Sequence, residues 1–192
     1  HAYFRSQGTP FDRRHAQTRK ITDMMESSFN ILRTLHDEHF ATMALLEKLE
    51  TALSGAKTAP ANDDSTMNRL LGDVEAVLHE EISHHYSFEE EHLFPLFGEF
   101  GDAGITMMLR GEHDIIRPLA AELSEMAKVG RKDGFTQESW DVFREKGLEL
   151  VEREVFHIQK EEMGFLPALD QIIDDDQDSE LTMAYVEIKN AS

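Results

Sequence analysis

The chain has 192 residues, a formal net charge of −19 and no cysteine. The charge argues against a nucleic-acid surface, because most of the molecule would repel a phosphate backbone. The lack of cysteine excludes a disulfide framework, a thiolate metal site and a thiol nucleophile. No apolar run approaches the roughly 20 residues that cross a bilayer and no signal-peptide pattern is visible, so we expect a cytoplasmic protein without a membrane partner. The start at His1 suggests processing or truncation, which would hide a lost targeting segment.

Residues 1–26 lack a clean hydrophobic period and are expected to form an arm. Beyond them, apolar-stripe positions recur with helical spacing, as in Leu35, His39 and Thr42. The sequences GAKTAPANDDST and FGEFGDAG interrupt this pattern, and Thr136 is a plausible N-cap of the last segment. The spacing predicts four long amphipathic helices, at about 27–55, 65–96, 104–130 and 136–174.

Four such helices predict an all-α domain over 27–174. A helix of about 28 residues is roughly 42 Å long, whereas the connection between the second and third helices spans at most about 25 Å. The chain therefore cannot run back along the bundle, which predicts an up-down-up-down four-helix bundle rather than a ferritin-like order with a long crossover. Residues 175–192 are expected to form an acidic C-terminal extension. The acidic run at 170–180, which spans this boundary, is interpreted as a solvated helix end and tail, and 181–189 as a short helix or strand that packs on the bundle.

Two segments repeat the same spacing of histidine, glutamate and proline. HYSFEEEHLFP at 85–95 and HIQKEEMGFLP at 157–167 each place a glutamate four residues after a histidine and a proline ten residues after it. A histidine and a glutamate with this spacing project from one helix face about 6 Å apart, so both can reach one metal ion. The other two helices share the sequences EHFATMALL and EHDIIRPLA, which align His39 with His113.

Counting along the four helices puts these residues at similar depths, so the sequence predicts that they meet inside the bundle. A lone histidine on an apolar stripe is more often a hydrogen-bonded core residue than a ligand. Burying two carboxylates without partners is costly, however, and no lysine or arginine lies on the same stripes. A bound cation removes this cost, which predicts a metal site. The predicted ligands are His39, His85, Glu89, His113, His157 and Glu161.

In order, the motifs HDEH, HHYSFEEEHLFP, GEHDIIRPL and HIQKEEMGFLP resemble those of the hemerythrin-like proteins, also called HHE cation-binding domains, over about 27–173. The resemblance implies a four-helix bundle with a non-haem di-iron centre and an oxo or hydroxo bridge. It also implies that Glu89 and Glu161 bridge the irons and that the four histidines are terminal ligands. Zinc and manganese can occupy similar ligand sets.

Several ligand assignments stay open. Oxygen-carrying hemerythrins have a second histidine four residues from the first on the third helix, where this chain has Leu109 and Arg117 beside His113. His36 or His92 could supply another imidazole. Glu162 competes with Glu161, because hemerythrins often place the carboxylate five residues after the histidine.

A ferritin-like set built on Glu-x-x-His is a further alternative. It would pair Glu89 with His92 and Glu154 with His157, and it breaks the register of the two repeats. It would also need bridging carboxylates from Glu38 and Glu112, which fall off the apolar stripes.

Two classes of function are compatible with such a site. The first is a binding module that takes up a small diatomic ligand, oxygen or nitric oxide, for carriage, storage or sensing. The alternative is a di-iron enzyme that acts on peroxide or nitric oxide or that repairs iron centres. The repair subgroup often has an added cysteine-bearing module, and this chain has no cysteine. The sequence favours the binding module and leaves the oligomeric state open.

Overall fold

The computed structural model describes residues 27, 29–99 and 103–191, so the predicted arm at 1–26 lies outside the described part. The described residues contain helices and no β-strand, which confirms the all-α class. The α-helices are α2 (Asn30–Gly55), α3 (Ser65–Glu80), α4 (Tyr86–Phe88), α5 (Phe94–Glu99), α6 (Gly104–Asp133), α7 (Gln137–Lys160), α8 (Leu166–Asp170) and α9 (Asp175–Asn190). The π-helical turns are η1 (Glu81–His85), η2 (Glu89–Leu93) and η3 (Glu161–Phe165).

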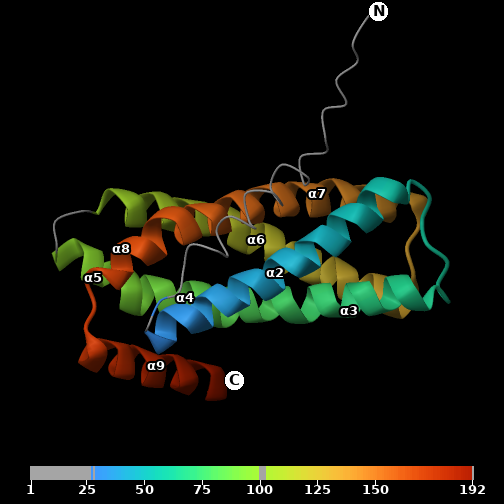
Figure 1. Ribbon diagram of the computed structural model, residues 1–192. Helices are drawn as coiled ribbons and strands as arrows, with labels where there is room; N and C mark the ends of the chain where they lie inside the picture. Colours follow the sequence, from blue (N-terminus) through green and yellow to red (C-terminus); the bar gives the residue numbers. More distant parts are fainter. Residues whose placement is uncertain (1–26, 28, 100–102, 192) are drawn as a thin grey trace, which may run out of the picture.

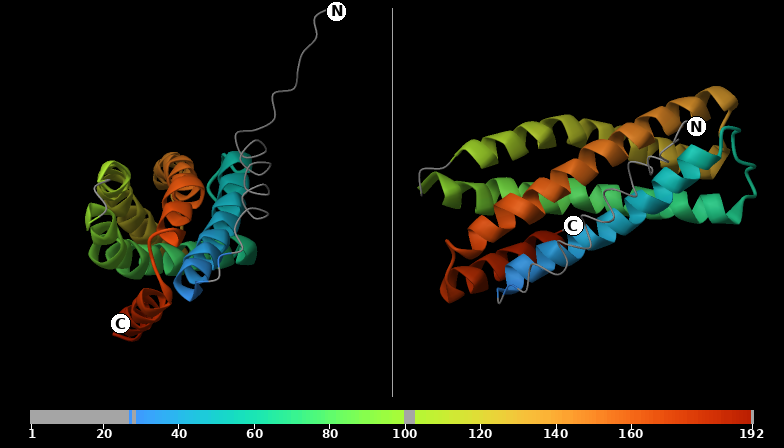
Figure 2. Two further views of the ribbon diagram at one scale, coloured as in Figure 1. Left: turned by 60° about the vertical axis from the view of Figure 1, so that its left-hand side comes forward. Right: turned by 45° about the horizontal axis from the view of Figure 1, so that its top comes forward.

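The helices join into long rods that lie side by side (Figures 1 and 2). One rod runs without a break from α3 to α5 and another from α7 to α8. Helix α3 packs against α6, and α7 packs against both α2 and α6. None of the helices in the described part has the length and apolar character that a bilayer crossing requires.

Turns η2 and η3 lie within the two repeated segments, and η1 ends where the first of these segments begins. Turn η1 ends at His85, η2 begins at Glu89 and η3 begins at Glu161. Such turns are rare and occur frequently at functional sites, because they redirect side chains relative to an α-helical register. The backbone is therefore irregular at the residues that the sequence marks for chemistry.

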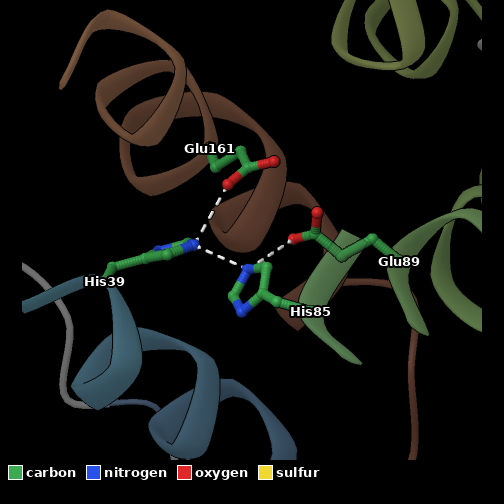
Figure 3. A group of neighbouring side chains, drawn as sticks. All are labelled: His39, His85, Glu89 and Glu161. Carbon is green, nitrogen blue, oxygen red and sulfur yellow. Dashed lines mark hydrogen bonds and ion pairs between the residues drawn. The ribbon is translucent and has the colours of Figure 1, made fainter. Parts of the chain in front are cut away.

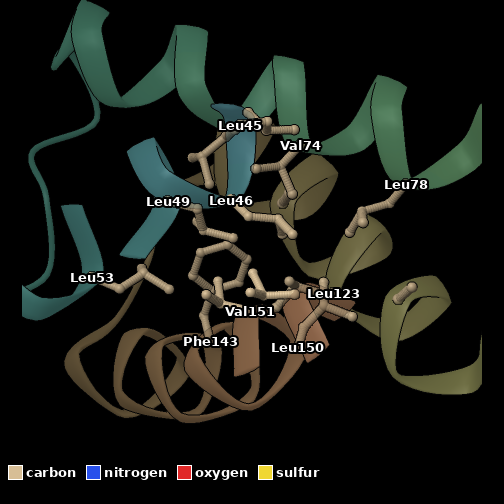
Figure 4. Close-up of a cluster of buried hydrophobic side chains, with 14 of the residues drawn as sticks. Leu45, Leu46, Leu49, Leu53, Val74, Leu78, Leu123, Phe143, Leu150 and Val151 are labelled. Atoms are coloured by element: carbon tan, nitrogen blue, oxygen red, sulfur yellow. The ribbon is translucent and has the colours of Figure 1, made fainter. Parts of the chain in front are cut away.

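Buried apolar side chains form two clusters along the rods. Leu46, Leu123 and Phe143 belong to the larger cluster, which Figure 4 shows. Phe88 and Phe165 belong to the second. Each fully buried side chain of this size stabilises the fold by roughly 1.5–3 kcal/mol, so both clusters contribute to rigidity. Along the rods the buried histidines and glutamates lie between the two clusters.

The end of α6 and the start of α7 are fixed by local signals. Gly134 has a φ of 81°, in the left-handed region that favours glycine. Thr136 is the N-cap of α7 and forms a capping box with Ser139, which confirms the predicted cap. The Trp140 Nε1–H group donates to the Ala56 carbonyl oxygen at 2.9 Å, which ties α7 to the end of α2.

The C-terminal region differs from the expectation of a solvated acidic tail. Helix α9 begins at Asp175 with a capping box between Asp174 and Gln177, and Leu181 and Tyr185 on it are buried. Helix α9 packs against α2 (Figure 1). Asp178 is also buried. Its carboxylate can be buried there because it accepts hydrogen bonds from backbone N–H groups at the start of α2. A carboxylate at a helix N-terminus is stabilised there, so part of the acidic run has a structural role.

Candidate metal centre

The six predicted ligands come together inside the bundle, and all are buried. They form two groups in which the ligand atoms all lie within 4.8 Å of one another. The His39 group consists of His39, His85, Glu89 and Glu161 (Figure 3). The His113 group consists of His113, His157, Glu89 and Glu161. The two glutamates are common to both groups.

The imidazoles of each group face one another through the same ring atom. His39 Nε2 lies 3.0 Å from His85 Nε2, and His113 Nε2 lies 3.0 Å from His157 Nε2. At this distance only one proton can lie between the two nitrogens, because two N–H groups would clash. When that proton is absent, two lone pairs point into the shared space, an arrangement that stabilises a cation.

The two shared glutamates divide their oxygens between the groups. Glu89 Oε1 lies 3.2 Å from His85 Nε2, and Glu89 Oε2 lies 3.4 Å from His113 Nε2. Glu161 Oε2 lies 3.0 Å from His39 Nε2, and Glu161 Oε1 lies 2.9 Å from His157 Nε2. Each carboxylate therefore offers one oxygen to each group, as a bridging carboxylate would.

The surroundings of these four carboxylate oxygens indicate whether a cation fits between the two pairs of imidazoles. All are fully buried, and none of them makes a hydrogen bond of good geometry within the described part of the chain. Buried polar atoms without such a partner are rare, and each costs about 1–3 kcal/mol. A cation in each group would satisfy the oxygens of Glu89 and Glu161 together with the facing nitrogens, so the donor set suits two metal ions.

The other ring nitrogen of each histidine contacts a carboxylate on a different helical segment. These outer carboxylates orient the rings and leave Nε2 facing the centre, as the supporting residues of metal sites do. The pairs are His39 Nδ1 with Glu162 Oε1 at 2.6 Å, His85 Nδ1 with Glu38 Oε2 at 3.0 Å, His113 Nδ1 with Glu90 Oε1 at 2.9 Å, and His157 Nδ1 with Glu112 Oε2 at 2.9 Å.

Sequence reasoning missed this role of the outer carboxylates, although a signal was present. Each is the direct chain neighbour of a predicted ligand, in the pairs EH and EE that both halves repeat. Because adjacent residues on a helix point about 100° apart, the second carboxylate of a pair can reach the neighbouring rod. Glu38 and Glu112 fall off the apolar stripes for this reason, and they support histidines instead of packing in the core.

The structure places the three alternative ligands, His36, His92 and Glu162, outside the His39 group and the His113 group. His36 Nδ1 lies 2.7 Å from Glu162 Oε2, on the outer side of the His39 ring. His92 stacks against Phe88 with ring centroids 5.3 Å apart. Neither His36, His92 nor Glu162 belongs to a group of converging ligand atoms in the described part. The ferritin-like set, which needs His92, is likewise not assembled there.

Burial and charge oppose one another at the ring nitrogens. Burial alone would lower the pKa of His39, but the close contacts of its ring nitrogens with the carboxylates of Glu161 and Glu162 outweigh burial and raise the pKa to about 10. In the same way, Glu161 and Glu89 overcome the effect of burial and raise the pKa of His113 to about 9. Without metal, protonated imidazoles therefore neutralise the central carboxylates, a source of charge balance that the sequence argument omitted.

The carboxylates show the complementary shift. Burial would raise the pKa of Glu161, but the charge of His157 and the close contacts with the neighbouring imidazoles hold this pKa well below its usual range. The pKa of Glu89 is lowered in the same sense, because His85 and His113 outweigh burial and the repulsion from Glu161. Both central carboxylates are therefore charged and available to a cation at neutral pH.

One side of the centre carries further buried polar groups: Tyr86 and Glu81, to which the sequence patterns gave no role, and Glu154, which belongs to the ferritin-like alternative. The Tyr86 hydroxyl donates to Glu154 Oε2 at 2.5 Å, and its ring stacks on the His113 ring at 3.7 Å between centroids. Burial, opposed by the charge of His85 but assisted by that of Glu154, raises the pKa of Glu81 to about 7. The signal for Glu81 was its place four residues before His85, on the same helical face.

Apolar rings line another part of the surroundings. Phe94 lies 5.7 Å from the His113 ring between centroids, and Phe165 packs edge-on against Phe94 at 5.4 Å. Both rings are buried, at 4% and 0% exposure. Water is thus excluded from the centre by apolar rings in addition to the closely packed rods.

Comparison with known proteins agrees with this geometry. The family model described as hemerythrin HHE cation binding domain matches residues 29–170. A search of curated proteins found no match. The matched region contains both groups and all four outer carboxylates, and it ends before α9.

Proposed function

Because the chain belongs to the hemerythrin HHE cation-binding family, we propose that it holds two iron ions and uses them to bind oxygen or nitric oxide reversibly. The observation that carries this proposal is the division of the Glu89 and Glu161 oxygens between two imidazole pairs. A single-ion site would need only one such pair. Carriage, storage and sensing all need this reversible step.

In this proposal the His39 group holds one iron and the His113 group holds the other. Two imidazole nitrogens and one oxygen from each of the carboxylates Glu89 and Glu161 would be available to each ion. The mixed nitrogen and oxygen donors suit iron, and zinc or manganese can occupy the same set. Iron bound there would supply the open coordination positions and the redox electrons that a small diatomic ligand requires.

The protein's own residues prepare the site for such a ligand. The outer carboxylates hold the rings in place, and the buried Phe94 and Phe165 keep bulk water away. Rigid support and exclusion of water favour reversible binding, because both suppress proton leakage and side reactions. The function therefore rests on packing around the centre as much as on the ligand set.

The Tyr86 side of the centre favours a second candidate, a di-iron enzyme that acts on peroxide or nitric oxide or repairs iron centres. Glu81 and the Tyr86–Glu154 pair are buried next to the predicted ligands. The carboxyl group of Glu81 can hold a proton near neutral pH, since its pKa is raised to about 7. Glu81 Oε1 lies 3.9 Å from the predicted ligand atom His85 Nε2. A proton donor so close to a redox centre is useful for turnover and unnecessary for reversible binding.

The proposal also includes the order and limits of the domain. We infer an up-down-up-down bundle over 27–174, which the short connection at 134–136 and the uninterrupted rods favour. The segment at 175–192 is then an extension of that bundle and lies beyond the family match.

Exposure of the anaerobically reduced, iron-loaded protein to oxygen tests the function. The binding module is expected to develop a visible absorption band that disappears under argon and returns over many cycles. Nitric oxide should produce a band of its own that also reverses. Irreversible oxidation, or consumption of peroxide or nitric oxide with a reductant present, would favour the enzyme. No spectral response to oxygen, nitric oxide or azide would contradict both functions.

A further inference from the structure

Helix α9 is anchored to α2 at two levels. Near its start, Asp178 Oδ1 accepts from the Ile31 N–H group at 2.8 Å, and Asp178 Oδ2 accepts from the Asn30 N–H group at 3.0 Å. Farther along, Leu181 and Tyr185 are buried at 8% and 2% exposure in the second apolar cluster. Helix α9 is therefore a docked element of the fold.

The second level of anchoring reaches the surroundings of the candidate metal centre. The Tyr185 hydroxyl donates to Glu38 Oε2, and the Lys189 ammonium group donates to Glu38 Oε1. Glu38 Oε2 is also the atom that contacts His85 Nδ1 at 3.0 Å. One carboxylate thus joins α9 to a histidine of the His39 group.

The two halves of the molecule differ at this point. In the second half, the outer carboxylate Glu112 contacts His157 and is held by Lys160, which lies one turn after His157 on the same rod. The position that corresponds to Lys160 in the first half is Phe88, which cannot donate a hydrogen bond. The ring of Phe88 instead packs against Tyr185 at 4.6 Å between centroids. The donor that the first repeat lacks is therefore supplied by α9.

We propose that Tyr185 and Lys189 are positioning residues for the metal centre, which act by fixing Glu38 and thereby the ring of His85. This inference rests on the proposed function, since it takes His85 as a metal ligand. Coupling between two binding events is reciprocal, so docking of α9 strengthens metal binding in the His39 group, and metal there strengthens docking of α9. The His113 group, whose support comes from within the bundle, does not depend on α9.

Anaerobic titration with iron(II) against a competing chelator tests this positioning role. The double variant Tyr185→Phe with Lys189→Met keeps the size of both side chains and removes both donors to Glu38. Loss of a supporting partner typically weakens a metal site about 10- to 100-fold, so one of the two equivalents should be released at correspondingly lower chelator concentration. The other equivalent should stay as tightly bound as in the unmodified protein.

Three matched variants separate positioning from general stabilisation. Lys189→Arg, made in a chain that keeps Tyr185, retains the positive charge. Its iron affinity should be much closer to that of the unmodified protein than the affinity of the double variant is. Lys160→Met removes the corresponding donor of the second half and should weaken one equivalent without loosening α9. Asp178→Asn weakens the anchor at the start of α2 without touching Glu38, so it should lower the melting temperature more than the iron affinity. Equal iron affinity in the double variant and the unmodified protein would overturn the proposal.

Amide hydrogen exchange on the unmodified protein gives a test that needs no variant. Iron should slow exchange in the second half of α9, 183–190, and the double variant should lose this protection. Identical exchange of α9 with and without two bound iron ions would contradict the coupling. If the unmodified protein failed to bind two equivalents of iron, the proposed function itself would be wrong, which distinguishes the two failures.

Discussion

Replacement of Glu161 by alanine is expected to reduce the bound iron from two equivalents to one or none. Its two oxygens contact His39 and His157, one in each group, so the substitution removes a donor from both ions at once. It also leaves Glu89 alone among imidazoles that were arranged for two carboxylates. Elemental analysis after gel filtration measures the loss, and circular dichroism shows whether the helices persist.

Two further substitutions define what this result means. Glu91→Ala alters an exposed carboxylate two residues after Glu89 and should leave two equivalents bound. Glu162→Ala removes the support of His39 and should weaken binding about 10- to 100-fold, while saturating iron still fills both positions. Full loss of metal in Glu162→Ala with retention in Glu161→Ala would show that the bridging carboxylate lies one residue later than proposed.

The metal-free protein is expected to lose stability as the pH rises from about 6.5 to about 10. The folded state raises the pKa of His39 to about 10 and that of His113 to about 9, whereas an unfolded histidine titrates near 6.5. A raised pKa contributes stability that is complete below about 6.5 and disappears as the pH passes the folded value. The lowered pKa values of Glu89 and Glu161 act at acidic pH, where their contribution is lost as the pH falls below about 4.5.

Metal should reverse the alkaline trend. A bound ion needs neutral imidazoles, so it replaces the protons and binds more tightly as the pH rises toward 9. At free metal a thousandfold above Kd, the added stability is about 4 kcal/mol. Melting temperatures measured from pH 5 to pH 9 should therefore diverge between the metal-free and metal-loaded protein. Parallel curves with a constant small gap would contradict the account.

The helices and the meeting of the histidines could be predicted because both follow from spacing along one chain. Apolar residues at helical intervals placed His39, His85, His113 and His157 on core stripes, and connection lengths limited how the rods could pack. The shared glutamates followed from the repeat of His85 with Glu89 and of His157 with Glu161. Two residues on the same helical face can be predicted to lie together without any information about the neighbouring helix.

The supporting contacts could not be predicted in the same way, because each joins residues on different rods. Glu38 lies beside His39 in the sequence but contacts His85, and Glu90 lies beside Glu89 but contacts His113. Such pairs depend on how one rod is rotated about its axis and shifted along its neighbour, and the hydrophobic period of the sequence determines this packing only coarsely. The π-helical turns add a further local rotation that an α-helical register does not contain.

The docking of α9 was obscured by its composition. Its first turns are acidic, and acidic runs are usually solvated, but the Asp178 carboxylate is stabilised by hydrogen bonds from the N-terminal amides of α2. The apolar positions Leu181 and Tyr185 are too few to distinguish a packed helix from a strand. The docking of α9 depends on the start of α2, which is distant in the sequence, and the sequence pattern does not show that these two segments are in contact.

X-ray absorption spectroscopy of the iron-loaded protein, with elemental analysis of the same sample, shows whether Glu89 and Glu161 bridge two iron ions. If Glu89 and Glu161 bridge two ions, the protein should contain two iron ions per chain, with nitrogen and oxygen neighbours and an iron–iron contact of no more than about 4 Å. Replacing both glutamates by alanine should abolish that contact. A single ion per chain, or two ions without a metal–metal contact, would contradict the bridged centre.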